Sequence, residues 1–157
     1  MPYYLPQKMG YLRQSWPGMN PREVVVFNNW MARHWQEYTG FDFNVRVGKG
    51  TDPGPTFSDE ARRQYVMNTQ KRIDAIAWKD VVPTLIEVKD RAGLSSIGQI
   101  IGYKRLYMSD NPVSPVPLLL LVYNRTDNDV IVTAQEVGIA IEAVEADFSG
   151  LKASSVL

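Results

Sequence analysis

Residues 118–123, LLLLVY, are apolar at every position. A strand with one face in water alternates apolar and polar residues, so an uninterrupted apolar run is typical of a strand that is covered on both faces. Helices must then pack on both sides of the sheet. The apolar run begins at Val116, is interrupted by Pro117 and is far too short to span a membrane. We therefore expect an α/β domain with no membrane association.

The rest of the chain changes between helical and extended patterns. Asn20 followed by Pro21 predicts the start of a helix, because Asn caps helices and proline suits the first helical position. That helix should run to about Tyr38, with Gly40 ending it. The predicted elements in order are helix 21–38, strands 41–47, 71–78 and 84–90, helix 95–109, strand 118–123, helix 127–137 and strand 139–144. Residues 60–70 are polar and show no clear pattern. The order of the predicted elements indicates an α/β sandwich with a mixed sheet flanked by helices.

The length of 157 residues suits a single folded domain. We expect an irregular N-terminal arm over residues 1–19, the domain over 20–145, and a flexible, weakly ordered C-terminal tail over 146–157. Apolar side chains such as Tyr3, Tyr4 and Trp16 make the arm too apolar to stay free in water. Residues 1–20 should therefore pack on this domain or on other protein chains.

The composition excludes several classes of site. Lys and Arg total 17 and Asp and Glu total 17, so a nucleic-acid binder that relies on a broad basic surface is excluded. The chain has no cysteine and one histidine, His34, which excludes disulfides, thiolate metal sites and a histidine-rich metal site within one chain. The N-terminus has no apolar core of signal-peptide length. We expect an intracellular protein, cytoplasmic or associated with a virion.

The segment 84–93, TLIEVKDRAG, places charged residues inside a predicted strand. Glu87 and Lys89 are two residues apart, so they share one face of that strand. On the preceding strand, Asp74 stands between two apolar residues. Pairing Asp74 with Glu87, Val88 or Lys89 would bring the charged groups together, and the sequence leaves these three registers open.

Two carboxylates and one ammonium in a small area point to phosphodiester chemistry. Carboxylates that lie a few Å apart repel each other, and a hard divalent cation removes that repulsion. Mg²⁺, or Mn²⁺, accepts one or two carboxylates together with water and phosphate oxygens. We expect Asp74, Glu87 and the Val88 carbonyl to bind the metal, and Lys89 to orient a water or offset charge on the phosphate.

These residues resemble a known superfamily. Ile73-Asp74, twelve residues and then Glu87-Val88-Lys89 resemble the D…ExK core of the PD-(D/E)XK, or restriction-endonuclease-like, nucleases, with Ile73 in place of the usual proline. The segment 99–103, QIIGY, is similar to the QxxxY motif of their exonuclease-type branch. The resemblance implies an αβββαβ core and a Mg²⁺-dependent deoxyribonuclease, either endonuclease or exonuclease. It also implies that Gln99 and Tyr103 hold the substrate strand. Lys104 and Arg105 are typical of an exposed helix face, from which they could meet a DNA backbone.

The resemblance also implies a further acid on the first helix. Glu23, near the start of that helix, is the candidate, and Glu37 is the alternative although it lies in the last turn. His34 is expected to pack on an apolar face rather than to bind metal.

Other interpretations of the same residues stay open. Glu87 and Lys89 can form a cross-strand ion pair on a solvated sheet face. Ser96 and Gln99 match a capping box, which would explain Gln99 without any substrate. Gly98 and Gly102 suit a helix that presses against the sheet or lets a phosphate approach its backbone. The whole chain can also be a nuclease-fold structural module within a larger assembly, such as a viral particle or repair complex.

Overall fold

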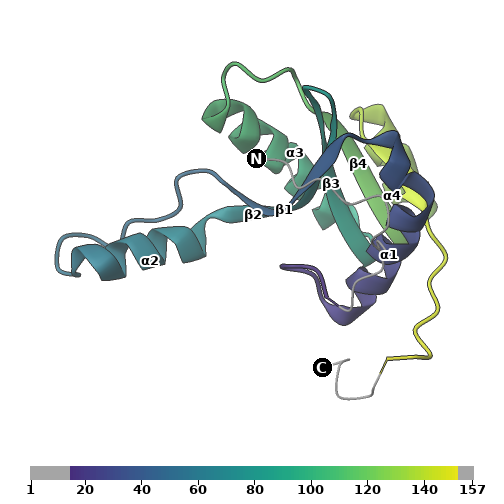
Figure 1. The fold of residues 1–157 in the computed structure, drawn as a ribbon, viewed down its shortest axis with the longest axis horizontal. Helices are drawn as coiled ribbons and strands as arrows, with labels where there is room; N and C mark the ends of the chain where they lie inside the picture. Colours follow the sequence, from purple (N-terminus) through teal and green to yellow (C-terminus); the bar gives the residue numbers. More distant parts are fainter. Residues whose placement is uncertain (1–14, 152–157) are drawn as a thin grey trace.

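The computed structural model describes residues 15–151 and contains one mixed sheet of five strands in the order β1-β2-β3-β4-β5 (Figure 1). The strands are β1 (Gly40–Val47), β2 (Lys71–Lys79), β3 (Val82–Arg91), β4 (Leu118–Arg125) and β5 (Ala140–Ala143). The first three strands pair antiparallel, and β4 and β5 add to them in parallel. The predicted α/β class and mixed sheet are confirmed, and each predicted strand is present with its ends moved by a few residues.

Helices cover both faces of the sheet. They are α1 (Pro21–His34), which continues into a short 3-10 turn, η1 (Trp35–Glu37), on one face, and α3 (Leu94–Asp110) and α4 (Asn128–Glu136) on the other. The remaining helix, α2 (Asp59–Thr69), does not cover the sheet. One core lies between α1 and the sheet, and a second lies between the sheet and the pair α3 and α4. Within β4, Leu120 and Val122 belong to the first core, and Leu119 and Leu121 to the second. The prediction that this strand is buried on both faces is confirmed.

Helix α1 begins with the predicted Asn20 cap, and Glu23 adds a second hydrogen bond. The Asn20 side chain accepts a hydrogen bond from the Glu23 N–H at 2.9 Å, and Glu23 Oε2 accepts one from the Asn20 N–H at 3.0 Å. Both bonds satisfy N–H groups that the first helical turn leaves without partners. The predicted end near Tyr38 is wrong by one turn, because the chain tightens into η1 after His34.

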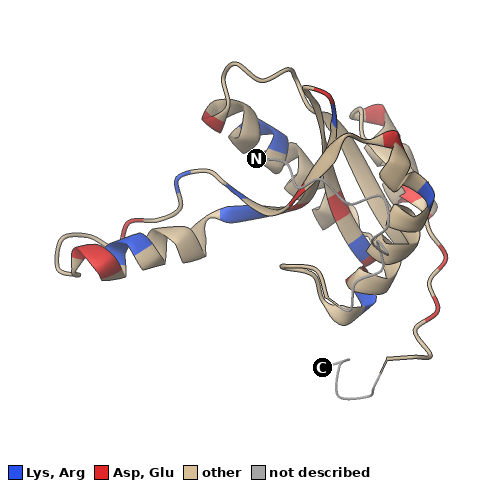
Figure 2. Ribbon diagram, in the orientation of Figure 1, with Lys and Arg blue, Asp and Glu red and all other residues tan. Residues whose placement is uncertain are grey.

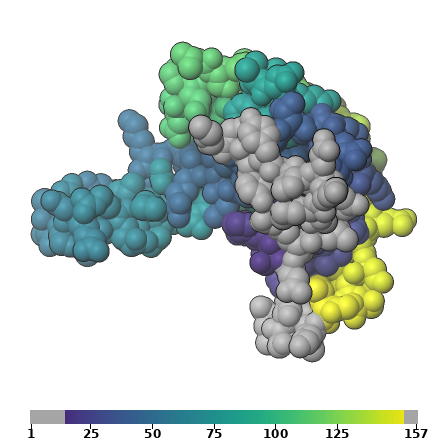
Figure 3. Space-filling model, viewed as in Figure 1, coloured from purple at the N-terminus to yellow at the C-terminus, as the bar shows by residue number. Residues whose placement is uncertain are grey.

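Residues 48–70, which we call the finger, project away from the body of the molecule (Figures 1 and 3). The segment 60–70, which shows no clear sequence pattern, is mostly α2, and Ser58 caps that helix through the Ala61 N–H at 3.2 Å. Every residue of α2 is at least partly exposed. A helix without a buried stripe has no apolar periodicity, which explains why the sequence did not reveal it.

The pairing of β1 with β2 is interrupted at Asn44 and Asp74, a few residues from the finger. The β1–β2 ladder has the pairs Phe43↔Ala75 and Val45↔Ile73, but between them Asn44 has a left-handed φ of 51°. Phe43 packs against the first core and Val45 against the second, so the strand changes face at Asn44. The β2–β3 ladder ends close by, at Ala75↔Ile86. From Asp74 toward the finger, β2 therefore separates from β3.

Both described chain ends pack on the domain. Trp16 is buried in the first core, and its indole N–H donates to Asn28 Oδ1 at 2.8 Å. In the expected tail, Phe148 packs against the same core and lies under the Arg22 guanidinium at 4.6 Å. The expected arm over residues 1–14 and tail over 152–157 lie outside the described residues. Among residues 15–151, no helix has the length and apolar character needed to cross a bilayer.

Candidate active site

The candidate site lies in the fork where β2 and β3 separate. Asp74 Oδ2 accepts a hydrogen bond from the Val88 N–H at 2.8 Å, at a point where backbone pairing between the two strands has ended. Continuing the register of Ala75↔Ile86 places Asp74 opposite Glu87, which is the first of the three registers left open by the sequence. The fork therefore brings the two predicted carboxylates to the same place.

Lys89 lies between carboxylates from two elements. Its Nζ is 2.9 Å from Glu87 Oε1 on β3 and 3.9 Å from Glu23 Oε1 on α1. The Glu87 side chain is only 3% exposed, compared with 26% for Lys89 and 13% for Glu23. The alternative of an ion pair on a solvated sheet face is therefore wrong for Glu87. The charge of Asp74 also acts on Lys89, so one ammonium faces three acidic side chains and the cluster can accept additional positive charge.

The second oxygen of Glu87 has unusual surroundings. Among the described residues, no donor reaches the buried Glu87 Oε2. A buried carboxylate oxygen without a donor is costly. Asp74 is close enough to affect the pKa of Glu87, so a proton shared by the two acids can stabilise the buried pair. A cation bound by both acids can stabilise it equally well.

Burial and mutual repulsion make this pair hold a proton more tightly than ordinary carboxylic acids. Burial and then the charge of Glu87 raise the pKa of Asp74 to about 8, although the Val88 N–H acts in the opposite direction. Burial also raises the pKa of Glu87, and the opposing effect of Lys89 is smaller. At neutral pH and without a metal, the pair therefore retains a proton.

The pKa of Lys89 is raised as well, but for a different reason. Burial alone would lower the pKa of Lys89, but Glu87, Glu23 and Asp74 together raise it above its ordinary value. Lys89 is therefore a fixed positive charge at neutral pH, and it cannot act as a general base there.

Two carboxylates and one carbonyl are available as metal ligands. Within the described part of the chain, no three His, Cys, Asp or Glu side chains are grouped closely enough to bind a metal. Asp74 and Glu87 are two such ligands, and Mg²⁺ needs no more protein carboxylates than that. The N–H and C=O of a strand residue point to the same edge of the strand. Because the Val88 N–H bonds to Asp74, the Val88 carbonyl is directed into the fork as well.

Helix α3 brings Gln99 and Tyr103 to a hollow of about 360 Å³ that Lys71 also lines. Burial and then the charges of Glu87 and Asp74 raise the pKa of the Tyr103 phenol, so its ring lies near the carboxylates. Lys104 is partly exposed and is not among the residues that line this hollow.

The predicted capping box is wrong. The N-cap of α3 is Gly93, no side chain caps this end, and Ser96 is buried inside the first turn. Gln99 is exposed on the helix surface, so helix capping does not explain it. Gly98 and Gly102 also line the hollow, and apart from their chain neighbours and the helix backbone no described atom lies within 4 Å of a Cβ built on either. The expectation that they press the helix against the sheet is wrong.

Glu37 and His34 lie in a different cluster. His34 Nδ1 is 3.0 Å from Glu37 Oε1, and His34 Nε2 is 2.7 Å from Glu142 Oε1 on β5. The Trp30 indole N–H donates to the same Glu142 side chain at 2.9 Å. Of the two predicted acids on α1, Glu23 is therefore the one that meets Lys89. His34 packs on the Trp30 ring as expected, but both of its nitrogens also meet carboxylates.

Asp90 is a residue whose role the sequence did not reveal, although it directly follows Lys89. Its carboxylate accepts hydrogen bonds from Arg22 at 3.1 Å and from Asn124 at 3.0 Å, and Arg125 lies 3.6 Å away. The Arg22, Asn124 and Arg125 contacts hold the pKa of Asp90 below its ordinary value, although burial acts against them. Arg22 is adjacent to Glu23, so Asp90 fixes the start of α1 to the end of β3 and positions Glu23 beside Lys89.

Comparison with known proteins supplies no relative from which a function could be transferred. A scan against protein-family models, a search of curated proteins and a search of solved structures each found no match to this chain.

Proposed function

We propose that this chain is a metal-dependent nuclease of the PD-(D/E)XK type that hydrolyses phosphodiester bonds in DNA. The observation that carries the proposal is the buried pair Asp74 and Glu87, which has one oxygen without a donor and a fixed ammonium beside it. The order α1-β1-β2-β3-α3-β4 supports a restriction-endonuclease-like αβββαβ core, with α2 inserted between β1 and β2.

Each residue of the fork has a role that follows from its surroundings. Asp74, Glu87 and the Val88 carbonyl would hold Mg²⁺ or Mn²⁺. When bound, such an ion lowers the pKa of a coordinated water and stabilises charge on a phosphate. Lys89 remains protonated, so it donates a hydrogen bond to the attacking water or to the phosphate and offsets developing negative charge. Glu23 holds the ammonium from the side of α1.

The buried pair of acids also favours a catalytic role over a purely structural one. A structural module gains nothing from two buried acids that repel each other, since apolar residues of similar size are generally as stable at such positions. The alternative function, a nuclease-fold interaction module within a larger assembly, would leave the fork without a use.

The direct test is cleavage of circular and linear DNA in Mg²⁺, in Mn²⁺ and in EDTA. We expect cleavage only with metal, and loss of circular substrate would identify an endonuclease.

Lys89→Gln keeps a donor for Glu87 but removes the charge, so cleavage should fall by on the order of a hundredfold or more while the circular dichroism spectrum stays the same. Glu37→Gln removes an acid from the distant His34 cluster and is the matched control, with cleavage unchanged. A folded Lys89→Gln variant with wild-type turnover would contradict the proposed role.

A further inference from the structure

Two neighbouring hollows lie at the start of β2, on the finger side of the fork. The larger hollow lies against α3 and is lined by Tyr103 and Gln99, among others. The smaller, of about 240 Å³, lies at the base of the finger and is lined by Lys49, Thr69 and the adjoining backbone. Lys71 lines both hollows, as does Leu106, so the two share a wall. Lys71 precedes Asp74 by three residues, which is roughly 10 Å along a strand.

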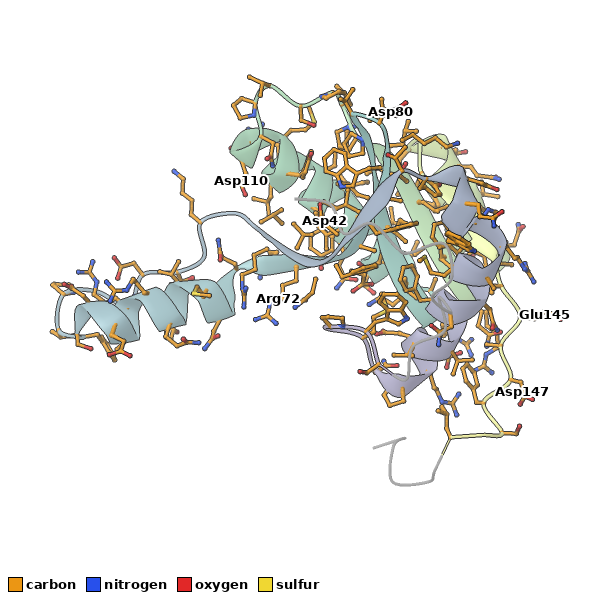
Figure 4. All side chains as sticks on the ribbon, viewed as in Figure 1. Asp42, Arg72, Asp80, Asp110, Glu145 and Asp147 are labelled. Atoms are coloured by element: carbon orange, nitrogen blue, oxygen red, sulfur yellow. The ribbon has the colours of Figure 1, made fainter. Side chains whose placement is uncertain are left out.

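The charge of the hollows differs from that of the whole chain. Among the described residues that line them, both hollows have lysine and neither has an acid. Within residues 15–151, Lys49 and Lys71 are exposed and form no ion pair. The nearby Asp110 accepts the Gly48 N–H at 2.8 Å. Gly48 lines the smaller hollow, so Asp110 lies beside that hollow. Figure 4 labels Asp110 at the end of α3 and Arg72 at the base of the finger.

The finger and its base together carry a net positive charge, and Figure 2 shows their Lys and Arg in blue. The acids of residues 46–72 are Asp52, Asp59 and Glu60, and Asp52 is already paired with Arg62. The basic residues of the same segment are Arg46, Lys49, Arg62, Arg63, Lys71 and Arg72. In a chain of zero net charge, this segment is therefore basic and the remainder is acidic.

The base of the finger is held in a fixed shape. Thr69 Oγ1 accepts the Thr51 N–H at 2.7 Å, and Gln70 Nε2 donates to the Gly48 carbonyl at 2.7 Å. Gly50 has a left-handed φ of 65°, and a Cβ there would collide with the Val66 carbonyl. A hollow whose walls are fixed in this way loses little entropy when it binds a ligand.

We propose that the two hollows form one groove that binds the sugar–phosphate backbone of a single nucleic-acid strand beside the Asp74 and Glu87 pair. This inference rests on the proposed function and names the substrate it takes. Lysine side chains and threonine hydroxyls are usual partners of phosphates, and Lys49, Lys71 and Thr51 line the groove. Hollows of a few hundred Å³ match small-molecule sites in size and are too small to hold a duplex.

The test measures binding of a fluorescein-labelled, single-stranded DNA oligonucleotide by anisotropy in EDTA, over a range of salt concentrations. Lys49→Ala combined with Lys71→Ala should weaken binding by on the order of tenfold and reduce the slope of log K against log salt by about 1.4, since each single-strand phosphate contact contributes about 0.7. Arg33→Ala combined with Lys79→Ala removes the same charge from exposed positions away from the groove. This control should bind with nearly the wild-type slope.

Each other outcome has a definite meaning. Equal losses in the two double variants, unchanged binding in the Lys49 and Lys71 variant, or no strand binding by the wild type would overturn the groove. A larger effect on a blunt duplex of the same sequence than on the single strand would overturn the single-strand assignment. Because binding in EDTA needs no cleavage, strand binding that depends on Lys49 and Lys71 supports the groove even if the wild type cuts no DNA. Cleavage without that dependence would refute the groove and leave the nuclease proposal standing.

Discussion

Glu87 is a buried carboxylate whose two oxygens have different surroundings. Oε1 receives the Lys89 ammonium, whereas Oε2 meets no donor in the described chain. Asp74 can donate to Glu87 only when it is protonated, because an ionised carboxylate accepts hydrogen bonds and has no proton to donate. Protonation and metal binding therefore compete for the same pair of acids.

This competition predicts how the stability of the metal-free protein depends on pH. The pKa of Asp74 is about 8 in the folded protein, above its ordinary value of 3.8, so the folded state binds the proton more tightly than the unfolded state. Stability is therefore highest below the unfolded pKa and is lost as pH rises toward about 8. We expect the urea midpoint in EDTA to fall between about pH 5 and about pH 9.

Asp74→Asn separates the two roles of the residue. An Asn side chain can accept the Val88 N–H and donate to Glu87 Oε2, so the free energy of unfolding at high pH should rise by about 1–3 kcal/mol. The pH dependence should flatten and metal-dependent cleavage should be lost. Asp59→Asn, at an exposed position on α2, should leave the wild-type pH dependence. A variant at Asp74 with the wild-type slope would show that this acid is not the group that titrates.

At the scale of the secondary-structure elements, α3 contains two glycines that its own packing does not require. Glycine inside a helix costs roughly 0.5–1 kcal/mol relative to alanine. Gly98 and Gly102 leave open space beside Gln99 and Tyr103, so a bound strand can approach the helix backbone there. Helix α3 is therefore less stable than it would be with alanine at these two positions, which lie on the side that faces the groove.

Replacing these glycines should change stability and activity in opposite directions. Gly98→Ala and Gly102→Ala should each raise the free energy of unfolding by about 0.5–1 kcal/mol, measured by urea denaturation. Cleavage and single-strand binding should both decrease, because each methyl group occupies part of the groove. Ser109→Ala, on an exposed position near the end of α3, is the control and should leave strand binding unchanged. Higher stability with undiminished strand binding would mean that the glycines have no role in the groove.

At the scale of the whole molecule, Trp16 is a part of the expected N-terminal arm that packs on its own domain. The Trp16 ring lies in the first core, 5.1 Å from the Phe27 ring, so this part of the expected arm packs on its own domain. Binding of other protein chains through residues 1–20 stays a prediction, which depends on Tyr3, Tyr4, Leu5, Tyr11 and Leu12. These residues lie outside the described part of the structure.

Deleting residues 2–14 tests this prediction without removing Trp16. Apolar side chains that bury surface between subunits should reduce the particle mass when they are lost, as measured by light scattering, because zero net charge gives little repulsion between copies. The melting temperature of the domain should stay close to that of the full chain at the same concentration. An unchanged mass with a much lower melting temperature would show that the segment packs within its own chain.

Some features of this protein follow from local sequence alone. Alternation along a strand puts Glu87 and Lys89 on one face, and Asn20 with Pro21 begins α1, because both effects depend on neighbouring residues. The capping box failed for a non-local reason: the Ala92 N–H bonds to the Arg125 carbonyl at 2.9 Å, and α3 begins directly after this link, so Ser96 falls inside the helix.

The site itself was decided by tertiary structure. No local pattern predicts that Asn44 adopts a left-handed φ or that β2 leaves β3 after Ala75, and both are needed for Asp74 to meet Val88. The choice of Glu23 over Glu37 depends on how α1 is fixed to β3, through the contact of Arg22 with Asp90. The sequence alone determined which residue types share a strand face, because that is a property of one strand. Register, strand separation and helix placement depend on contacts between distant segments, and these exist only in the folded chain.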